Sequence, residues 1–263
     1  AAGLSAIQIG AASIRAGMDT IVLAGGTESI SSTPMLMKSV PASSRNPQQW
    51  APESHPDSPQ APAWDMSITV GENTAREAGV TRLQSDEWAF HSHQRAFAAA
   101  SSGRFDDEIV PVEISDGEGG TKMFRRDEHP RGDTTMERLG ALKPLHPEIP
   151  NATVTSGNSS GLNDAAAAVM MMSDQAVRAH GIKPLARVVS WASVGIDPVL
   201  TGLAPTRAIP KALMRAGMEL GDIDLFEINE AFCSMAVAST RILGIDHSIA
   251  NVNGSGCGLG HPI

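Results

Sequence analysis

Apolar side chains recur near the start of the chain at the spacing of a helix. From Leu4 to Ile14 they lie three or four positions apart, and Gly17 follows as a C-terminal cap. The next apolar run, Thr20–Ala24, has the uninterrupted character of a strand buried on both faces. A helix followed directly by such a strand predicts an α/β sheet.

The middle of the chain departs from this pattern because prolines accumulate there. Twelve of the 17 prolines lie between Pro34 and Pro150, and the segment 41–62 is dense enough in proline to exclude helix and central strand. We therefore interpret residues 33–161 as an insertion on the main sheet. Within it the pattern predicts helices over Val70–Ala78 and over Ser85–Ser101, the latter opened by Ser85, and a strand over Glu108–Ile114.

The α/β pattern returns at Asn163. Asn163 or Asp164 is expected to cap an Ala-rich helix that runs to His180 and ends at Gly181. Later segments alternate in type. We expect strands over Leu185–Val194, Asp224–Ile228 and Ser248–Val252, and helices over Pro205–Ala216 and Glu230–Leu243.

Composition narrows the class of protein. The 263 residues are 41% hydrophobic, which is enough to bury a core, and the net charge of −9 disfavours binding to nucleic acid or to anionic membranes. Two cysteines exclude a disulfide scaffold and a thiolate zinc cluster, and they suit a reducing compartment. The apolar runs are too short for membrane insertion. We expect a cytoplasmic location, with an organellar matrix as the alternative.

Two motifs follow predicted strands and carry candidate chemistry. Asn229-Glu230-Ala231-Phe232 places a polar amide after the strand 224–228, where open α/β sheets bind their ligands. The second motif is a glycine-rich run from Asn253 to Pro262. Its glycines allow close approach to a ligand, and it brings His261 to the end of the last strand.

These motifs, together with TIVLAGGTESIS, GRFDDEIVPV and GLNDAAAA, resemble the thiolase family of acyl-CoA acyltransferases from Ala1 to Ile263. The resemblance implies an α/β thiolase fold of two related halves with an inserted loop domain. Residues 1–32 and 162–183 would belong to the N-terminal half, 33–161 to the CoA-binding loop domain and 184–263 to the C-terminal half.

The resemblance also locates the family's catalytic cysteines. Thiolases carry a nucleophilic cysteine directly before a small-small-Gly-Leu run, which Ala1–Leu4 matches, and a second cysteine beyond the Gly-His-Pro run. Both positions fall outside this sequence. We therefore expect a fragment that is truncated at both ends and inactive by itself. Cys233 and Cys257 match neither position and are interpreted as small buried side chains.

The implied reaction is thiolytic cleavage of a 3-ketoacyl-CoA, or the reverse Claisen condensation of acetyl-CoA, as in fatty-acid metabolism. His261 would be the base that takes the proton of the nucleophilic thiol, and Asn229 would hold a water in an oxyanion hole. Coenzyme A is a substrate here, and neither a redox cofactor nor a metal is expected. Members of the family form homodimers or homotetramers, so we expect one of these assemblies.

Coenzyme A itself would be bound by residues that match family contacts. Ser160 aligns with a contact in the pantetheine channel, Met66 with a position over that channel, and Arg131 with a nucleotide contact. Phe232 is a further candidate for contact with the CoA substrate. Arg131 lies in a segment, 122–143, with six cationic and four acidic side chains, which suits phosphates but also suits a solvated loop. Many biosynthetic members have histidine directly before the methionine, whereas this chain has Asp65. Acyl-chain preference therefore stays open.

Two other functions compete with this interpretation. Gly157–Gly161 spells G-x-S-x-G, so Ser159 could be the nucleophile of an α/β-hydrolase, with Asp197 or Asp224 and with His247 or His261 as partners. A thiolase-like protein that binds acyl-CoA or lipid without catalysis is the other alternative. A metal site at His91 and His93 is disfavoured because residues two apart on a helix face different sides.

Overall fold

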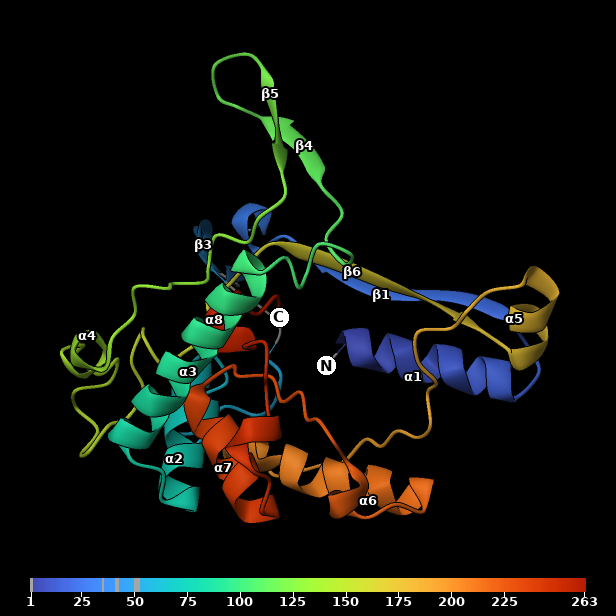
Figure 1. Cartoon of the computed structure of the whole chain (residues 1–263). Coiled ribbons are helices and arrows are strands. Elements are labelled where there is room, and N and C mark those ends of the chain that lie inside the picture. Colours follow the sequence, from blue (N-terminus) through green and yellow to red (C-terminus); the bar gives the residue numbers. More distant parts are fainter. Residues whose placement is uncertain (1, 35, 41–42, 50–52) are drawn as a thin grey trace.

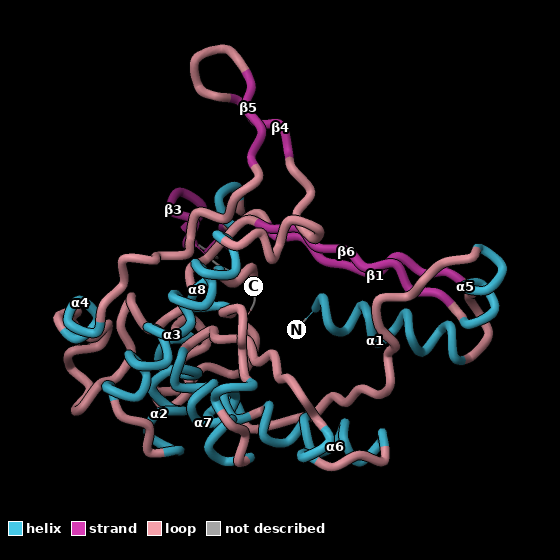
Figure 2. Tube along the Cα trace, viewed as in Figure 1, coloured by secondary structure: helices cyan, strands magenta, loops and turns pink. Residues whose placement is uncertain are grey.

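Two regions make up the fold in the computed structural model, which describes residues 2–34, 36–40, 43–49 and 53–263. Figure 1 shows one of them extending to the side as a layer of helix against a long two-stranded ribbon. We call this region the arm; it consists of α1 (Ala2–Arg15), β1 (Ile21–Glu28), β6 (Ala165–Met172) and α5 (Asp174–His180). The other region, which we call the compact part, consists of helices joined by long loops, from which a hairpin of two short strands projects (Figure 2).

The arm depends on an antiparallel pair between β1 and β6. The register runs from Ile21 opposite Met172 to Glu28 opposite Ala165. The prediction of a helix from Asn163 is therefore wrong for its first half, while α5 ends as expected, at Gly181 in a left-handed conformation. Alanine favours helix by itself, but a complete ladder of hydrogen bonds to β1 outweighs this local preference.

Close packing in the ribbon requires glycine at one position. A Cβ atom at Gly25 would lie 2.4 Å from the carbonyl oxygen of Ala167 on the neighbouring strand. The prediction that this strand is fully buried is wrong, since Ala24 is its buried residue and Leu23 is 69% exposed. α1 covers one face of the ribbon, and the other face has no layer of helices over it among the described residues.

The compact part is centred on α3 (Arg82–Ser101), which packs against α7 (Cys233–Leu243) and α8 (Gly256–Leu259). Thr81 rather than Ser85 caps α3: its hydroxyl accepts from the Gln84 amide while the Gln84 side chain accepts from the Thr81 amide. The predicted helix over Val70–Ala78 consists of a short π-helix, η2 (Ser67–Glu72), followed by α2 (Asn73–Ala78).

The C-terminal elements confirm some of the expected boundaries and correct others. α6 (Pro205–Ala216) matches its prediction, and α7 begins at Cys233 instead of Glu230. The two expected strands 224–228 and 248–252 are reduced to a single parallel bridge between Phe226 and Ala250. The described segment 185–194 forms no strand: the carbonyls of Val188 and Val189 accept hydrogen bonds from the Arg15 guanidinium instead of a neighbouring strand.

Smaller elements complete the described chain. The proline-rich region contains a hairpin of two short strands, so it holds edge strands but no central one, and residues 41–42 and 50–52 lie outside the described part. The strand expected over Glu108–Ile114 begins later than predicted, within a second hairpin. The remaining elements are β2 (Met37–Val40), β3 (Ser43–Gln49), β4 (Val112–Ser115), β5 (Thr121–Phe124), α4 (Met136–Gly140) and the 3₁₀ turns η1 (Ile30–Ser32), η3 (Pro198–Leu203), η4 (Leu220–Asp222) and η5 (His247–Ile249).

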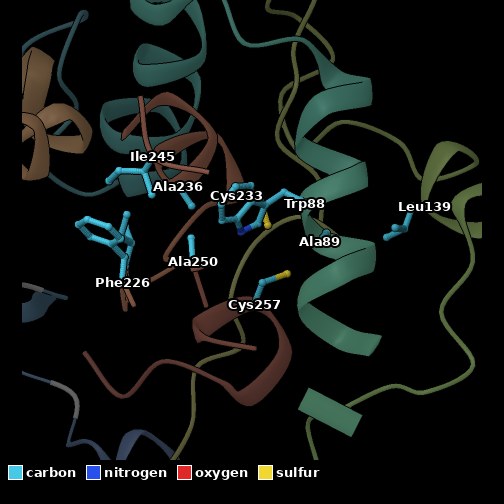
Figure 3. Packing of buried hydrophobic residues seen from close by; sticks show 10 residues of the cluster. Trp88, Ala89, Leu139, Phe226, Cys233, Ala236, Ile245, Ala250 and Cys257 are labelled. Carbon is cyan, nitrogen blue, oxygen red and sulfur yellow. The ribbon is translucent and has the colours of Figure 1, made fainter. Parts of the chain in front are cut away.

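The core lies where α3, α7 and α8 meet. Trp88 and Ala89 from α3 pack with Cys233 and Ala236 from α7, and Cys257 of α8 closes the cluster (Figure 3). Four of these five side chains have no exposed surface, and Trp88 is 6% exposed. Across the described residues, no helix has the length and apolar character needed to cross a bilayer.

Candidate active site

Backbone hydrogen bonds bring three distant segments of the sequence together above this core. The amide of Ser160 donates to the Ala231 carbonyl (3.0 Å), and the amide of Cys233 donates to the Asn158 carbonyl (2.9 Å). The amide of His261 donates to the Gly161 carbonyl (2.9 Å). The G-x-S-x-G segment, the Asn-Glu-Ala-Phe motif and the glycine run are therefore parts of one site.

Asn229 and Glu230 point to opposite sides of their segment. Asn229 is exposed, and its Oδ1 lies so close to the glycine run that a Cβ atom at Gly256 would be 2.6 Å away. A side chain at position 256 would therefore displace the Asn229 amide. The Asn229 amide is thus held at the edge of the glycine run, where it can bind a water or a carbonyl oxygen.

The carboxylate of Glu230 is buried and holds several segments of the site together through hydrogen bonds. It has no exposed surface, and its Oε1 accepts from Trp88 Nε1 and Asn251 Nδ2, both at 2.7 Å. Its Oε2 accepts from the Ser92 hydroxyl (2.5 Å) and the Cys257 amide (3.1 Å). Burial raises the pKa of Glu230, and these hydrogen bonds oppose that rise. One carboxylate therefore ties α3, the 250–251 segment and α8 to the Asn229 motif.

The arrangement at His261 favours a neutral imidazole. The ring is half-buried, and desolvation lowers its pKa below the ordinary value of 6.5. Gly260 precedes it with φ +100°, and a Cβ atom there would lie 2.2 Å from Asn163 Oδ1. That oxygen is itself buried and has no hydrogen-bond partner in the described part of the chain. A neutral imidazole with a fixed backbone is suited to accept a proton.

Two histidines of the inserted region lie behind this loop. His129 Nε2 hydrogen-bonds the Cys257 carbonyl (2.9 Å), and the His129 and His93 rings have centroids 5.8 Å apart. The backbone N–H of Arg131 donates to His93 Nδ1 (3.4 Å), while Arg131 is exposed. Burial lowers the pKa of His93 to about 4, and the nearby charges of His129 and Arg131 contribute. The backbone of Arg131 therefore lies next to the two histidines that contact the glycine run.

Met66 lies at a separate hollow that η2 connects to the site. Within η2, a Cβ atom at Gly71 would lie 3.1 Å from the Phe232 ring, and the Gly71 carbonyl accepts from the Ser234 hydroxyl (2.9 Å). Phe232 is partly buried at the start of α7. Met66 is 37% exposed and lines a hollow of about 260 Å³.

The serine-hydrolase geometry is not formed. The hydroxyl of Ser159 donates to the Thr155 carbonyl (2.7 Å) and contacts no histidine through a hydrogen bond in the described residues. Asp197 caps η3, and His247 stacks on Trp88 with ring centroids 4.3 Å apart. A serine nucleophile needs a base within hydrogen-bond distance, so Ser159 is a structural residue here.

Cys233 and Cys257 occupy the hydrophobic core, as expected for small buried side chains (Figure 3). Burial and the neighbouring Cys257 thiol raise the pKa of Cys233 well above its ordinary value. His93 is buried and His91 exposed, in agreement with their predicted placement on different sides of α3. Among the described residues, no group of three or more His, Cys, Asp or Glu side chains could hold a metal ion.

The sequence interpretation overlooked Glu230, His129 and Asn163 as members of the site. Glu230 was visible only as part of a motif, and nothing in its local sequence showed that it would be buried. Its hydrogen-bond partners Ser92 and Asn251 stand in stretches that carry no recognisable motif either. Ser92 is 138 residues from Glu230, and His129 is 128 residues from its partner Cys257, so only the tertiary structure identifies these contacts.

Comparison with known proteins gives a consistent result along the whole chain. The model for the N-terminal domain of thiolase matches residues 1–175, and that for the C-terminal domain matches residues 182–263. A beta-ketothiolase (BktB) of Cupriavidus necator is 42% identical over 262 residues, covering 99% of this chain and 66% of that protein. An acetyl-CoA acetyltransferase of Escherichia coli is 41% identical over 268 residues, with the same two coverages.

Solved structures show the same similarity. The acetyl-CoA acetyltransferase of Syntrophomonas wolfei superposes with a TM-score of 0.89 at 36% identity, covering 99% of this chain and 67% of the other. Human mitochondrial 3-ketoacyl-CoA thiolase gives 0.86 at 37% identity, with coverages of 99% and 66%. The chain thus spans about two thirds (66%) of the length of the curated relatives it matches.

Proposed function

This chain belongs to the thiolase family and has its α/β fold, and on that premise we propose that it carries the base and the ligand loops of an acyl-CoA acyltransferase. The substrates are a 3-ketoacyl-CoA and coenzyme A, or acetyl-CoA in the reverse direction. The observation that carries the proposal is the joining of His261, Ser160 and the Asn229 motif by backbone hydrogen bonds.

His261 acts as the base in this proposal. Its imidazole, kept neutral by burial, takes the proton of a cysteine thiol, and the thiolate attacks the keto carbonyl of the substrate. The C2–C3 bond then breaks with its electron pair on C2 of the leaving acetyl-CoA, and that carbon takes a proton from the family's second cysteine. The acyl group remains on sulfur until the thiol of coenzyme A loses its proton, attacks the thioester carbonyl and releases the cysteine. We place the acyl-carrying cysteine outside residues 1–263, because Cys233 and Cys257 are fully buried in the core.

Asn229 stabilises the oxyanion through a water that its exposed amide holds at the glycine run. One positioned donor of this kind lowers the activation free energy by about 3 kcal/mol. Ser160 and Phe232 contact pantetheine, and the exposed Arg131 binds the nucleotide phosphates. The division into an N-terminal half (1–32 and 162–183), a loop domain (33–161) and a C-terminal half (184–263) remains part of the proposal, as does a homodimer or homotetramer.

The test uses a protein of full family length that contains residues 1–263. His261→Ala should lower kcat by roughly 10²–10⁴-fold and leave the Kd for coenzyme A within about twofold. Arg131→Ala should instead raise KM for the acyl-CoA more than it lowers kcat. His180→Ala, at the exposed end of α5, is the matched control. Unchanged turnover in His261→Ala would contradict the proposal. Coenzyme A binding by the parent without any turnover would also contradict it, and would indicate a binding protein.

A further inference from the structure

The residues on both sides of Met66 are bonded to a histidine from a different loop. His146 Nε2 lies 2.6 Å from the Ser67 hydroxyl and 3.4 Å from Asp65 Oδ2. Asp65 Oδ1 accepts from the Ser67 hydroxyl (2.5 Å) and from the Ser67 amide (3.1 Å). The His146 side chain is only 15% exposed, so it is packed in place rather than free in solvent.

Hydrogen-bond directions decide what this cluster can do. The Ser67 hydroxyl has one proton, and the carboxylate of Asp65 accepts it at 2.5 Å, so the serine oxygen must accept from His146 Nε2. On the other side of the ring, Nδ1 lies 3.1 Å from Glu148 Oε1. The imidazole therefore bridges the Ser67 hydroxyl and the Glu148 carboxylate. A serine whose proton is directed to an aspartate is not poised as a nucleophile, so the cluster connects two loops.

The hollow beside Met66 is lined by both apolar and polar side chains, and the polar ones have partners within the protein. The hydroxyls of Thr69 and Thr201 donate to the carbonyls of Pro62 and Pro198 (2.8 and 2.7 Å). The ring of His55 is likewise engaged, by its neighbour Ser54 and by a backbone carbonyl. Polar groups that are satisfied within the protein need no polar partner from a ligand, and Met66, Ile196 and Pro198 supply the apolar part of the lining. Hydrocarbon can therefore occupy this space of about 260 Å³.

We propose that His146 is the positioning residue that fixes Met66 at this hollow and thereby sets how the acyl end of the CoA ester fits there. The inference rests on the proposed function. Asp65 and Ser67 stand on either side of Met66, and the contacts of both with His146 fix the backbone between them.

The first measurement does not depend on catalysis. Hydrogen exchange of the Ser67 and Ile68 amides, which both donate to Asp65, should become at least tenfold faster in His146→Leu than in the parent. His146→Gln keeps one donor for Ser67 and should restore most of the protection. Glu137→Gln, an exposed residue of α4, serves as the control. Equal exchange in the leucine variant and the parent would overturn the positioning role.

The second measurement links this role to the substrate. With a series of 3-ketoacyl-CoA esters of increasing chain length, His146→Leu should raise KM about tenfold for the preferred ester while kcat changes less than threefold, and His146→Gln should recover most of the loss. Faster exchange with an unchanged chain-length profile would overturn the effect on specificity. A parent without any acyl transfer would contradict the proposed function instead, and the exchange data would still decide the role of His146.

Discussion

The arm and the compact part use similar apolar residues with opposite results. In the compact part, Trp88 and Cys233 are buried because three helices converge on them. In the arm, Leu4, Leu23 and Met170 are more than 60% exposed, although they belong to a regular helix and a regular ribbon. The difference shows that an apolar pattern places the apolar side chains on one face of a helix or strand. Whether that face is buried depends on a second element that packs against it.

The largest expected effect compares one apolar side chain from each region. Phe226 is 8% exposed and packs into the core cluster, whereas Leu23 is 69% exposed. Phe226→Ala should lower the free energy of unfolding by about 3–5 kcal/mol, since it removes buried surface and leaves a cavity. Leu23→Ala should change it by less than about 0.5 kcal/mol. Urea unfolding followed by tryptophan fluorescence measures both, and equal losses would remove the distinction between the two regions.

Acid should act on the compact part before the arm. Burial, helped by the charges of His129 and Arg131, lowers the pKa of His93 to about 4, from 6.5. The unfolded chain binds this proton below pH 6.5 but the folded chain only near pH 4, so stability is full above pH 6.5 and falls as the pH drops toward 4.

His93→Gln should remove the part of this acid-induced loss of unfolding free energy that His93 causes, which is on the order of 2–3 kcal/mol at pH 4.5. The measurement is the difference in unfolding free energy between pH 7.5 and pH 4.5, for the parent and the variant. His247, whose pKa burial also lowers to about 4, should contribute a second part of the same acid sensitivity. An identical loss in parent and variant would show that His93 is not buried in the neutral form.

The smallest of the three effects concerns the carboxylate that joins the core to the site. Glu230→Gln keeps one acceptor oxygen but turns an amide NH₂ toward two donors, which should cost about 1–2 kcal/mol. Glu87→Gln, exposed on the same helix as Trp88 and Ser92, should change stability by less than about 0.5 kcal/mol. Because Glu230 also orients the Asn229 motif, kcat should fall along with stability; a stable variant with full kcat would mean that the site does not need this carboxylate.

Local signals in the sequence were sufficient for several elements and for the motifs of the site. Proline at the start of α6 and glycine after α1, α5 and α6 define helix ends through restrictions on a few torsion angles. The motifs with Asn229 and His261 were identifiable for a similar reason, since glycines and polar residues after apolar runs act within about ten positions. The spacing of these motifs in the sequence does not predict the backbone hydrogen bonds that join them.

The sequence by itself determined the family, the helix ends and the chemical types of the candidate residues, all of which depend on contiguous stretches. Only the tertiary structure decided that Ala165–Met172 is a strand, because its ladder partner is β1, more than a hundred residues earlier. It likewise decided that Glu230 is buried beneath the site and that His146 lies beside Met66. Burial and hydrogen bonding are properties of pairs of segments, and no single segment contains the information about its partner.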